Sequence, residues 1–142
     1  MIREAKEMDR FCIVAMARRF ESVAGFPVRG DAAYFSMSLV SAIRRSDALC
    51  LVVDVGTPVG FLLADLQRSL LSPRPFAAEH MLWIDEPYRG SWFRPLVKAY
   101  EDWARKNGAA GAFLSAQQDG RTSKVFDRIG FKAVQTHHLK VF

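Results

Sequence analysis

The residues with the clearest chemical potential lie in one run, Trp83 to Leu96, where an apolar stretch ends in a turn and an amphipathic pattern follows at once. Asp85, Pro87 and Gly90 mark the turn. The first four backbone N–H groups of a helix have no partner inside the helix, and the helix dipole adds positive potential there. A helix that starts at this turn would therefore favour a phosphate group.

This run resembles the acyl-CoA pyrophosphate loop of the GNAT superfamily, the N-acetyltransferases that use acetyl-CoA. The family pattern is Arg/Gln-x-x-Gly-x-Gly/Ala, and Arg89 matches its first position. Trp92 and Arg94 stand where the two glycines are expected. The resemblance implies that the strand backbone contacts the pantetheine arm and that the loop contacts the pyrophosphate. The residues that it assigns to these contacts are Trp83, Ile84, Asp85, Arg89, Gly90, Ser91, Trp92, Phe93 and Arg94.

The two replaced glycines change what the loop can do. Glycine lets a backbone approach a phosphate closely, and Cβ atoms at Trp92 and Arg94 narrow that approach. Arg94 can compensate, because a guanidinium pairs with phosphate bidentately. Trp92 cannot, and we expect it to pack on the sheet or to stack over a ligand. The alternative interpretation is a helix N-terminus that binds no nucleotide.

Transfer of an acetyl group to an amine needs a group that takes a proton from the amine. Glu79 is the one carboxylate near the start of the strand that leads into the loop, and GNAT enzymes often place a glutamate there. Neighbouring side chains of a strand point to opposite faces, so Glu79 and His80 are expected on opposite faces. A neutral His80 is equally able to act as the base. The alternative is that Glu79 is a solvated strand-end residue and His80 a hydrogen-bonded core residue.

The resemblance also indicates where a general acid would lie. The family commonly has a tyrosine, close to the CoA sulfur, in the helix before a Gly-Phe pair. Gly130-Phe131 matches that pair, and Phe126 occupies the tyrosine position without a proton to give. Ser123 is a weak substitute one turn earlier, and the leaving thiolate can otherwise take its proton from water.

Hydrophobic periodicity and turn residues predict the order β-α-α-β-β-β-α-β-α-β. Asp31 is expected to cap the second helix, and Pro95 to lie in the first turn of the helix behind the loop. This order is also that of the GNAT fold. It predicts a mixed, mostly antiparallel α/β (α+β) sheet flanked by helices on both faces, as one domain over residues 1–142. The predicted elements are strands at Ile2–Ala5, Leu49–Val55, Val59–Leu66, Ala78–Ile84 and Ala110–Ala116, helices at Met8–Phe20 and Arg121–Ile129, and a closing strand or hairpin at Phe131–Phe142.

Composition narrows the class of partner. The chain has 142 residues and a net charge of +5, but its basic residues are scattered, which does not favour nucleic acid. A polyanion such as CoA would benefit from the same charge. No apolar run reaches the roughly 18 residues that a membrane span needs, so no membrane partner is expected. The three histidines show no metal-ligand spacing.

Two further features concern location and assembly. The N-terminus is charged rather than apolar, and Cys12 and Cys50 lie among apolar neighbours. We expect two reduced, buried thiols in a cytoplasmic protein, with a disulfide as the alternative. The apolar run Leu139 to Phe142 could pair with another subunit's edge strand, which leaves a homodimer open.

The sequence therefore supports two hypotheses of different class. The first is a GNAT-type N-acetyltransferase that moves an acetyl group from acetyl-CoA to an amine of unknown acceptor. The second is a catalytically weakened GNAT-fold protein that acts as a CoA-binding or interaction module. The missing glycines and tyrosine favour the second hypothesis, whereas the intact fold pattern and Arg89-Gly90 favour the first.

Overall fold

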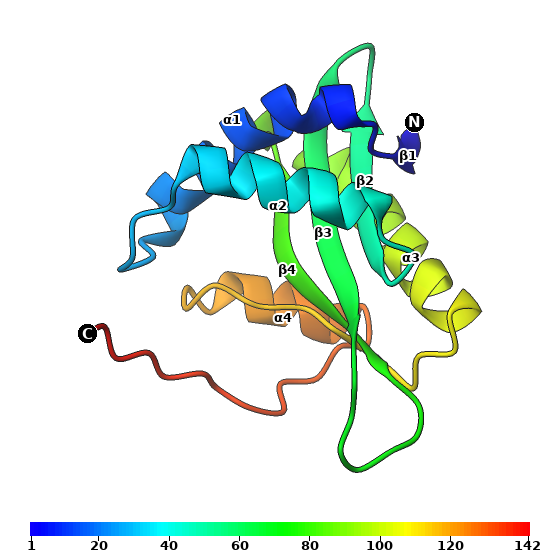
Figure 1. Ribbon diagram of the computed structural model, residues 1–142. Coiled ribbons are helices and arrows are strands. Elements are labelled where there is room, and N and C mark those ends of the chain that lie inside the picture. The colour runs from blue at the N-terminus through cyan, green and yellow to red at the C-terminus, as the bar shows by residue number, and fades with distance from the viewer.

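A five-stranded sheet of order β1-β2-β3-β4-β5 forms the centre of the protein (Figure 1). The computed structural model describes all of residues 1–142. Neighbouring strands are antiparallel except β4 and β5, which run parallel. The strands are β1 (Ile2–Glu4), β2 (Ala48–Asp54), β3 (Pro58–Gln67), β4 (Phe76–Ile84) and β5 (Ala112–Phe113). The helices are α1 (Arg10–Ala24), α2 (Ala32–Arg44), α3 (Arg89–Lys106) and α4 (Arg121–Arg128), with 3-10 turns at Glu7–Asp9 and Glu86–Tyr88.

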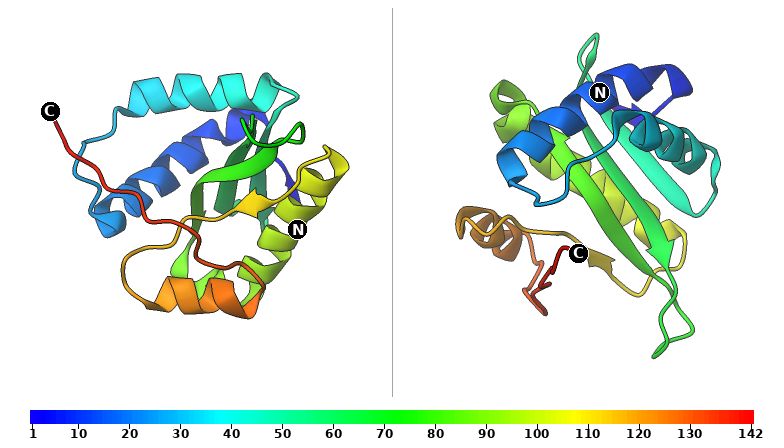
Figure 2. Two further views of the ribbon diagram at one scale, coloured as in Figure 1. Left: turned by 90° about the horizontal axis from the view of Figure 1, so that it is seen from below. Right: turned by 60° about the vertical axis from the view of Figure 1, so that its left-hand side comes forward.

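The helices cover both faces of the sheet, as the hydrophobic pattern predicts (Figure 2). Helices α1 and α2 bury one face, where Ile13 and Leu39 pack with Phe61 of β3. Helix α3 buries the other face, where Leu96 and Tyr100 pack with the alternate residues of the strands. The predicted mixed, mostly antiparallel sheet between two helical layers is confirmed.

Local signals identify the first two helices, although α1 begins at Arg10 and ends at Ala24 rather than running over the predicted Met8–Phe20. Helix α1 ends at Gly25, whose φ of 62° is the left-handed conformation that glycine adopts without strain. Helix α2 begins behind Asp31, whose Oδ1 accepts the backbone N–H of Tyr34 at 2.8 Å. The predicted cap at Asp31 is confirmed.

The start of α3 differs from the prediction. The Glu86–Tyr88 turn leads directly into a helix at Arg89, so the residues expected in a loop already form the first helical turns. Pro95 is consequently inside the helix rather than in its first turn. It has no N–H to offer the carbonyl of Ser91, which lies near the exposed helix start where water can serve instead.

The C-terminal third of the chain has less strand than predicted. Only Ala112–Phe113 of the Ala110–Ala116 segment is a strand, because the chain leaves β4 after two paired residues. The expected closing strand or hairpin at Phe131–Phe142 is wrong: no residue of this segment belongs to a strand, and residues 132–142 make no backbone–backbone hydrogen bond. Pairing of this segment with a second copy stays a prediction.

A bulge in β4 decides which face each of its side chains occupies. Leu63 pairs with Met81 and Ala64 pairs with Glu79, which leaves His80 without a partner on β3. The extra residue reverses the alternation of faces. Glu79 therefore lies on the α3 face with Ala64, whereas Met81 packs on the α1 and α2 face.

Candidate active site

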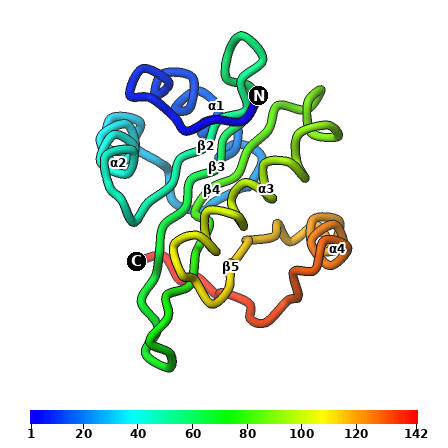
Figure 3. The backbone as a smooth tube through the Cα atoms, turned by 90° about the vertical axis from the view of Figure 1, so that its right-hand side faces the viewer, coloured from blue at the N-terminus to red at the C-terminus, as the bar shows by residue number.

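The point where β4 and β5 separate is the centre of the candidate site. The two parallel strands pair only at Ala77–Ala112 and Ala78–Phe113, and the chain then runs away from β4 toward α4 (Figure 3). Beyond this fork the facing edges of the two strands carry backbone groups that no strand pairs. Glu79 is the first residue of β4 past the fork, and its Oε2 accepts the backbone N–H of Ser115 at 2.9 Å.

Glu79 is a buried acid with an unusual affinity for protons. Its residue surface is 9% exposed. Burial raises the pKa of Glu79 to about 7, while the hydrogen bond from Ser115 and the nearby charge of His80 oppose that rise. A carboxyl group with a pKa near neutrality exists in both protonation states at neutral pH, as a proton acceptor in catalysis requires.

Tyr100 of α3 fixes the β5 side of the fork. Its ring is fully buried, and its hydroxyl donates to the Phe113 carbonyl at 3.0 Å. Burial, with the charge of Glu79 adding to it, raises the pKa of Tyr100, so the hydroxyl keeps its proton. Helix α3 thus holds β5 two residues before Ser115 donates to Glu79.

His80 lies toward the face opposite Glu79, because its partner Asp65 follows Ala64 on β3 and so points to the other face. Its ring is partly exposed, and its Nε2 is 2.8 Å from Oδ1 of Asp65 on β3. Of the two candidate bases, the structure brings Glu79 to the fork and leaves His80 at a solvated pair. A solvated Glu79 with a core His80 is the reverse of the observed arrangement.

The backbone near the end of β4 alternates between two edges. The Asp85 N–H donates to the Val59 carbonyl, so it faces β3. The Ile84 carbonyl faces the opposite edge, where it accepts Arg89 Nε at 2.8 Å. Along an antiparallel strand these directions alternate, so Leu82 shares the open edge with Ile84. Of the three residues expected to contact pantetheine through the backbone, Ile84 is the one at the open edge.

The first turn of α3 offers space as well as charge. Gly90 is exposed, and a Cβ atom added there would meet nothing within 4 Å. Ser91 beside it is also exposed. Trp92 and Phe93 are half-buried and pack against the core on the α3 face. Arg94 instead lines a groove of about 470 Å³ along the outside of α3, together with Lys98 and Arg105.

A family model described as "Acetyltransferase (GNAT) family" matches residues 14–131, which include both strands of the fork and all of α3. The chain belongs to the GNAT acetyltransferase family. No curated protein matches it significantly in sequence.

Solved structures of other GNAT acetyltransferases share the fold at low sequence identity. Glucosamine-6-phosphate N-acetyltransferase from Arabidopsis thaliana is 13% identical with a TM-score of 0.80, and the match covers 100% of this chain and 97% of that one. AAC(6')-Iy, in complex with a bisubstrate analogue, CoA-S-monomethyl-acetylneamine, is 13% identical, with a TM-score of 0.80 and the same coverage. Ribosomal-protein-alanine N-acetyltransferase from Brucella melitensis biovar Abortus 2308 is 14% identical, with a TM-score of 0.76 and coverage of 100% and 99%.

Phe126, at the tyrosine position of the GNAT pattern, belongs to an aromatic stack. Its buried ring lies almost parallel to that of Phe93, at an interplanar angle of 6° and a centroid distance of 6.0 Å. Phe131 packs on it at 6.4 Å. The stack attaches α4 to the first turns of α3 and carries no exchangeable proton. Ser123 is half-buried one turn earlier.

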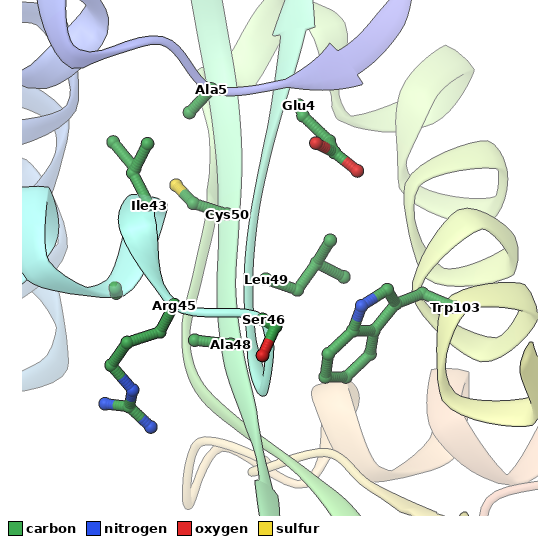
Figure 4. Close-up of a pocket in the computed structure, with 10 residues that line it drawn as sticks. Glu4, Ala5, Ile43, Arg45, Ser46, Ala48, Leu49, Cys50 and Trp103 are labelled. Atoms are coloured by element: carbon green, nitrogen blue, oxygen red, sulfur yellow. The ribbon is translucent and has the colours of Figure 1, made fainter. Parts of the chain in front are cut away.

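Other parts of this GNAT chain offer fewer candidate functional groups. A cavity of about 140 Å³ lies between the end of α2, strands β1 and β2, and Trp103 of α3 (Figure 4), and none of the candidate residues lines it. No cluster of three or more His, Cys, Asp or Glu side chains could hold a metal ion. None of the helices has the length and apolar character that crossing a membrane requires.

Sequence reasoning missed three residues that the structure places near the candidate site. Ser115 contributes only its backbone N–H, which any residue type could supply, so no sequence signal could have found it. Tyr100 follows the helical spacing of a core residue, and its hydroxyl bond depends on where β5 ends. Arg19 of α1 forms an ion pair with Asp85 across 66 positions of sequence.

Proposed function

We propose that this GNAT chain is an N-acetyltransferase that moves the acetyl group of acetyl-CoA to an amine, with Glu79 as the proton acceptor. The observation that carries this proposal is a buried carboxyl group, with a pKa of about 7, at the fork between two separating parallel strands. Structures that share the fold are named as acetyltransferases of an aminoglycoside, a ribosomal protein and glucosamine-6-phosphate, so the fold does not select the acceptor.

The described residues fit an acyl-CoA donor. At the edge of β4 that no strand pairs, Arg89 bonds the Ile84 carbonyl, and the other backbone groups of Leu82 and Ile84 are offered to the amide-bearing pantetheine arm, as the resemblance implies. Open space lies at Gly90 in the first turn of α3. Trp92 packs against the core, and Arg89 and Arg94 are exposed cations. In the proposal these residues hold the donor so that its thioester lies near the fork.

The proposed reaction balances with one proton accepted by the protein. Acetyl-CoA supplies an electrophilic thioester carbon. The amine nitrogen attacks that carbon, the new C–N bond forms, and the C–S bond breaks. Ionised Glu79 takes the proton that the amine loses, and the Ser115 N–H keeps the carboxylate in place. The thiolate takes its proton from water, because Phe126 has none to give, and Glu79 returns its proton to the hydroxide that remains.

Calorimetric titration with acetyl-CoA, followed by a turnover assay against a panel of amines, tests this proposal. We expect a saturable heat of binding and release of free CoA thiol that depends on the amine. The panel should include an aminoglycoside, a sugar amine and a peptide with a free N-terminus. Absence of heat and of a thermal shift at about 1 mM acetyl-CoA, the upper range of usual KM values, would show that the donor is wrong.

A second candidate function is a CoA-binding module without turnover. The observation that favours it is Phe126, whose position in an aromatic stack removes the family's usual proton donor. Binding of acetyl-CoA with no acetylation of any amine in the panel would select this function. Binding followed by acetylation would select the transferase.

A further inference from the structure

Four side chains form a connected chain between α1 and the start of α3. Arg19 donates from Nε and Nη2 to the two carboxylate oxygens of Asp85, each at 3.1 Å. The Trp83 indole N–H donates to the same carboxylate at 2.8 Å. The Arg89 guanidinium carbon lies 4.9 Å from the centroid of the Trp83 ring.

This arrangement fixes Arg89 while leaving most of its donors free. Its Nε donates to the Ile84 carbonyl at 2.8 Å, and the Trp83 ring supports one side of its guanidinium. No protein group bonds its two terminal nitrogens, so their four N–H donors remain for a ligand in a planar fork. The guanidinium fork matches the geometry of a phosphate group and binds it bidentately. A side chain that is already held loses less entropy when it binds.

We propose that Trp83, Asp85 and Arg19 are positioning residues that hold the Arg89 guanidinium for a phosphate group of the acyl donor. The proposal rests on the proposed function, because it assumes that the donor is an acyl-CoA. It explains how phosphate binding can persist with Trp92 and Arg94 at the glycine positions. A pre-oriented side chain then replaces part of what a glycine backbone would offer.

The direction in which one substitution changes acetyl-CoA affinity separates this proposal from simple charge attraction. Asp85→Asn removes a negative charge near the phosphate site, so charge attraction alone predicts tighter binding of acetyl-CoA. If Asp85 instead anchors Trp83 and Arg19, the same change releases Arg89 and weakens binding. We expect the dissociation constant to rise about two- to tenfold, the range for loss of one pre-organised side chain.

A matched pair on α1 tests Arg19. Arg19→Gln breaks the ion pair with Asp85. Arg18→Gln removes the same charge from the preceding residue, whose side chain makes no hydrogen bond or ion pair. Arg19→Gln should weaken acetyl-CoA binding more than Arg18→Gln. In an Arg89→Ala background the two variants should have equal effects, because Arg19 acts through Arg89. The effects should also disappear with S-acetylpantetheine, which lacks the phosphates.

The outcomes distinguish failure of the inference from failure of the proposed function. If the unmodified protein binds no acetyl-CoA, the proposed function is wrong. If it binds and Asp85→Asn binds equally well or more tightly, the positioning role is wrong. The same conclusion follows if Arg19→Gln and Arg18→Gln weaken binding equally while Arg89 is intact. Melting temperatures of all variants show whether each is folded. Trp83→Phe keeps a ring under Arg89 but loses the indole N–H. Its affinity for acetyl-CoA should lie between those of the unmodified protein and Arg89→Ala.

Discussion

The acidic side chains near the two ends of β4 lie in different environments. At the fork, Glu79 is buried and a single neutral backbone N–H holds it. At the end next to α3, Asp85 lies partly in solvent between a cation and an indole. Removal from water changes the proton affinity of the first group, whereas pairing holds the second in place.

The contrast suggests a division of labour along one strand. Desolvation shifts a pKa strongly without any sequence motif, because it depends on what packs around the group. An exposed ion pair contributes at most about 1 kcal/mol to stability, so such pairs can vary without loss of the fold. Under the proposed function, the end of β4 that carries Glu79 should therefore tolerate little change, and the end next to α3 should accept substitutes such as Trp92 and Arg94.

Glu79→Gln gives the largest expected effect and tests the fork directly. It keeps the shape of the side chain but removes the proton acceptor, so kcat should fall about 10²- to 10⁴-fold while acetyl-CoA affinity is retained. In the unmodified protein, kcat/KM should decline below pH about 7 as Glu79 becomes protonated. Steady-state rates between pH 5 and about 9 measure both effects.

Glu86→Gln is the matched control, because Glu86 is an exposed carboxylate at the other end of β4. It should leave the rate and the pH profile unchanged. Equal rates for Glu79→Gln and Glu86→Gln would show that Glu79 takes no part in the reaction and that the two ends of β4 do not differ in function.

Burial of Glu79 should also make stability depend on pH. Its pKa is raised from 4.5 to about 7 in the folded chain. Between these values the unfolded chain has released the proton and the folded chain retains it, so the free energy of unfolding falls as pH rises. The full loss, reached above pH 7, is about 3 kcal/mol at 1.36 kcal/mol for each pKa unit. Urea unfolding at pH 5 and at about pH 8 should show most of this loss in the unmodified protein and none of it in Glu79→Gln; equal losses would place its source elsewhere.

Trp92→Ala tests whether the binding end accepts bulk without harm. Trp92 packs against the core on the α3 face, and truncation of a half-buried tryptophan should lower the free energy of unfolding by about 2–3 kcal/mol. Acetyl-CoA affinity should not improve. Urea unfolding and calorimetry on the same variant give both numbers, with Trp92→Phe as the milder control. Tighter binding by Trp92→Ala would mean that the indole obstructs the phosphate site.

Local patterns predicted the features that depend on neighbours in sequence. The β2–β3 hairpin follows from two apolar runs around a short turn, and the Asp31 cap follows from one side chain near its own helix. The turn before α3 was recognisable because the strand, turn and helix are consecutive. Its helix start was misplaced because the Glu86–Tyr88 turn, which begins the helix early, has no separate signal.

Features that depend on distant pairing were beyond the sequence. The bulge at His80 exists only because β3 and β4 pair in a particular register. The fork depends on where β5 leaves β4, and nothing in Ala110–Ala116 marks that residue. The sequence therefore identified Glu79 as a candidate but could not predict its burial, which gives the carboxyl group its shifted pKa.

Phe126→Tyr has the smallest expected effect and tests whether α4 can deliver a proton to the leaving sulfur. The variant restores a hydroxyl at nearly constant volume, in a ring that stacks on Phe93 of α3. If that hydroxyl reaches the leaving sulfur, kcat should rise about tenfold, below the 10²–10⁴ range of an evolved acid because the stack fixes the ring. Phe93→Tyr is the control, since it adds the same hydroxyl to the partner ring. The gain should persist in the Glu79→Gln background, because accepting the amine proton and protonating the thiolate are separate transfers. Equal rates for both tyrosine variants and the unmodified protein would show that the stack lies away from the sulfur.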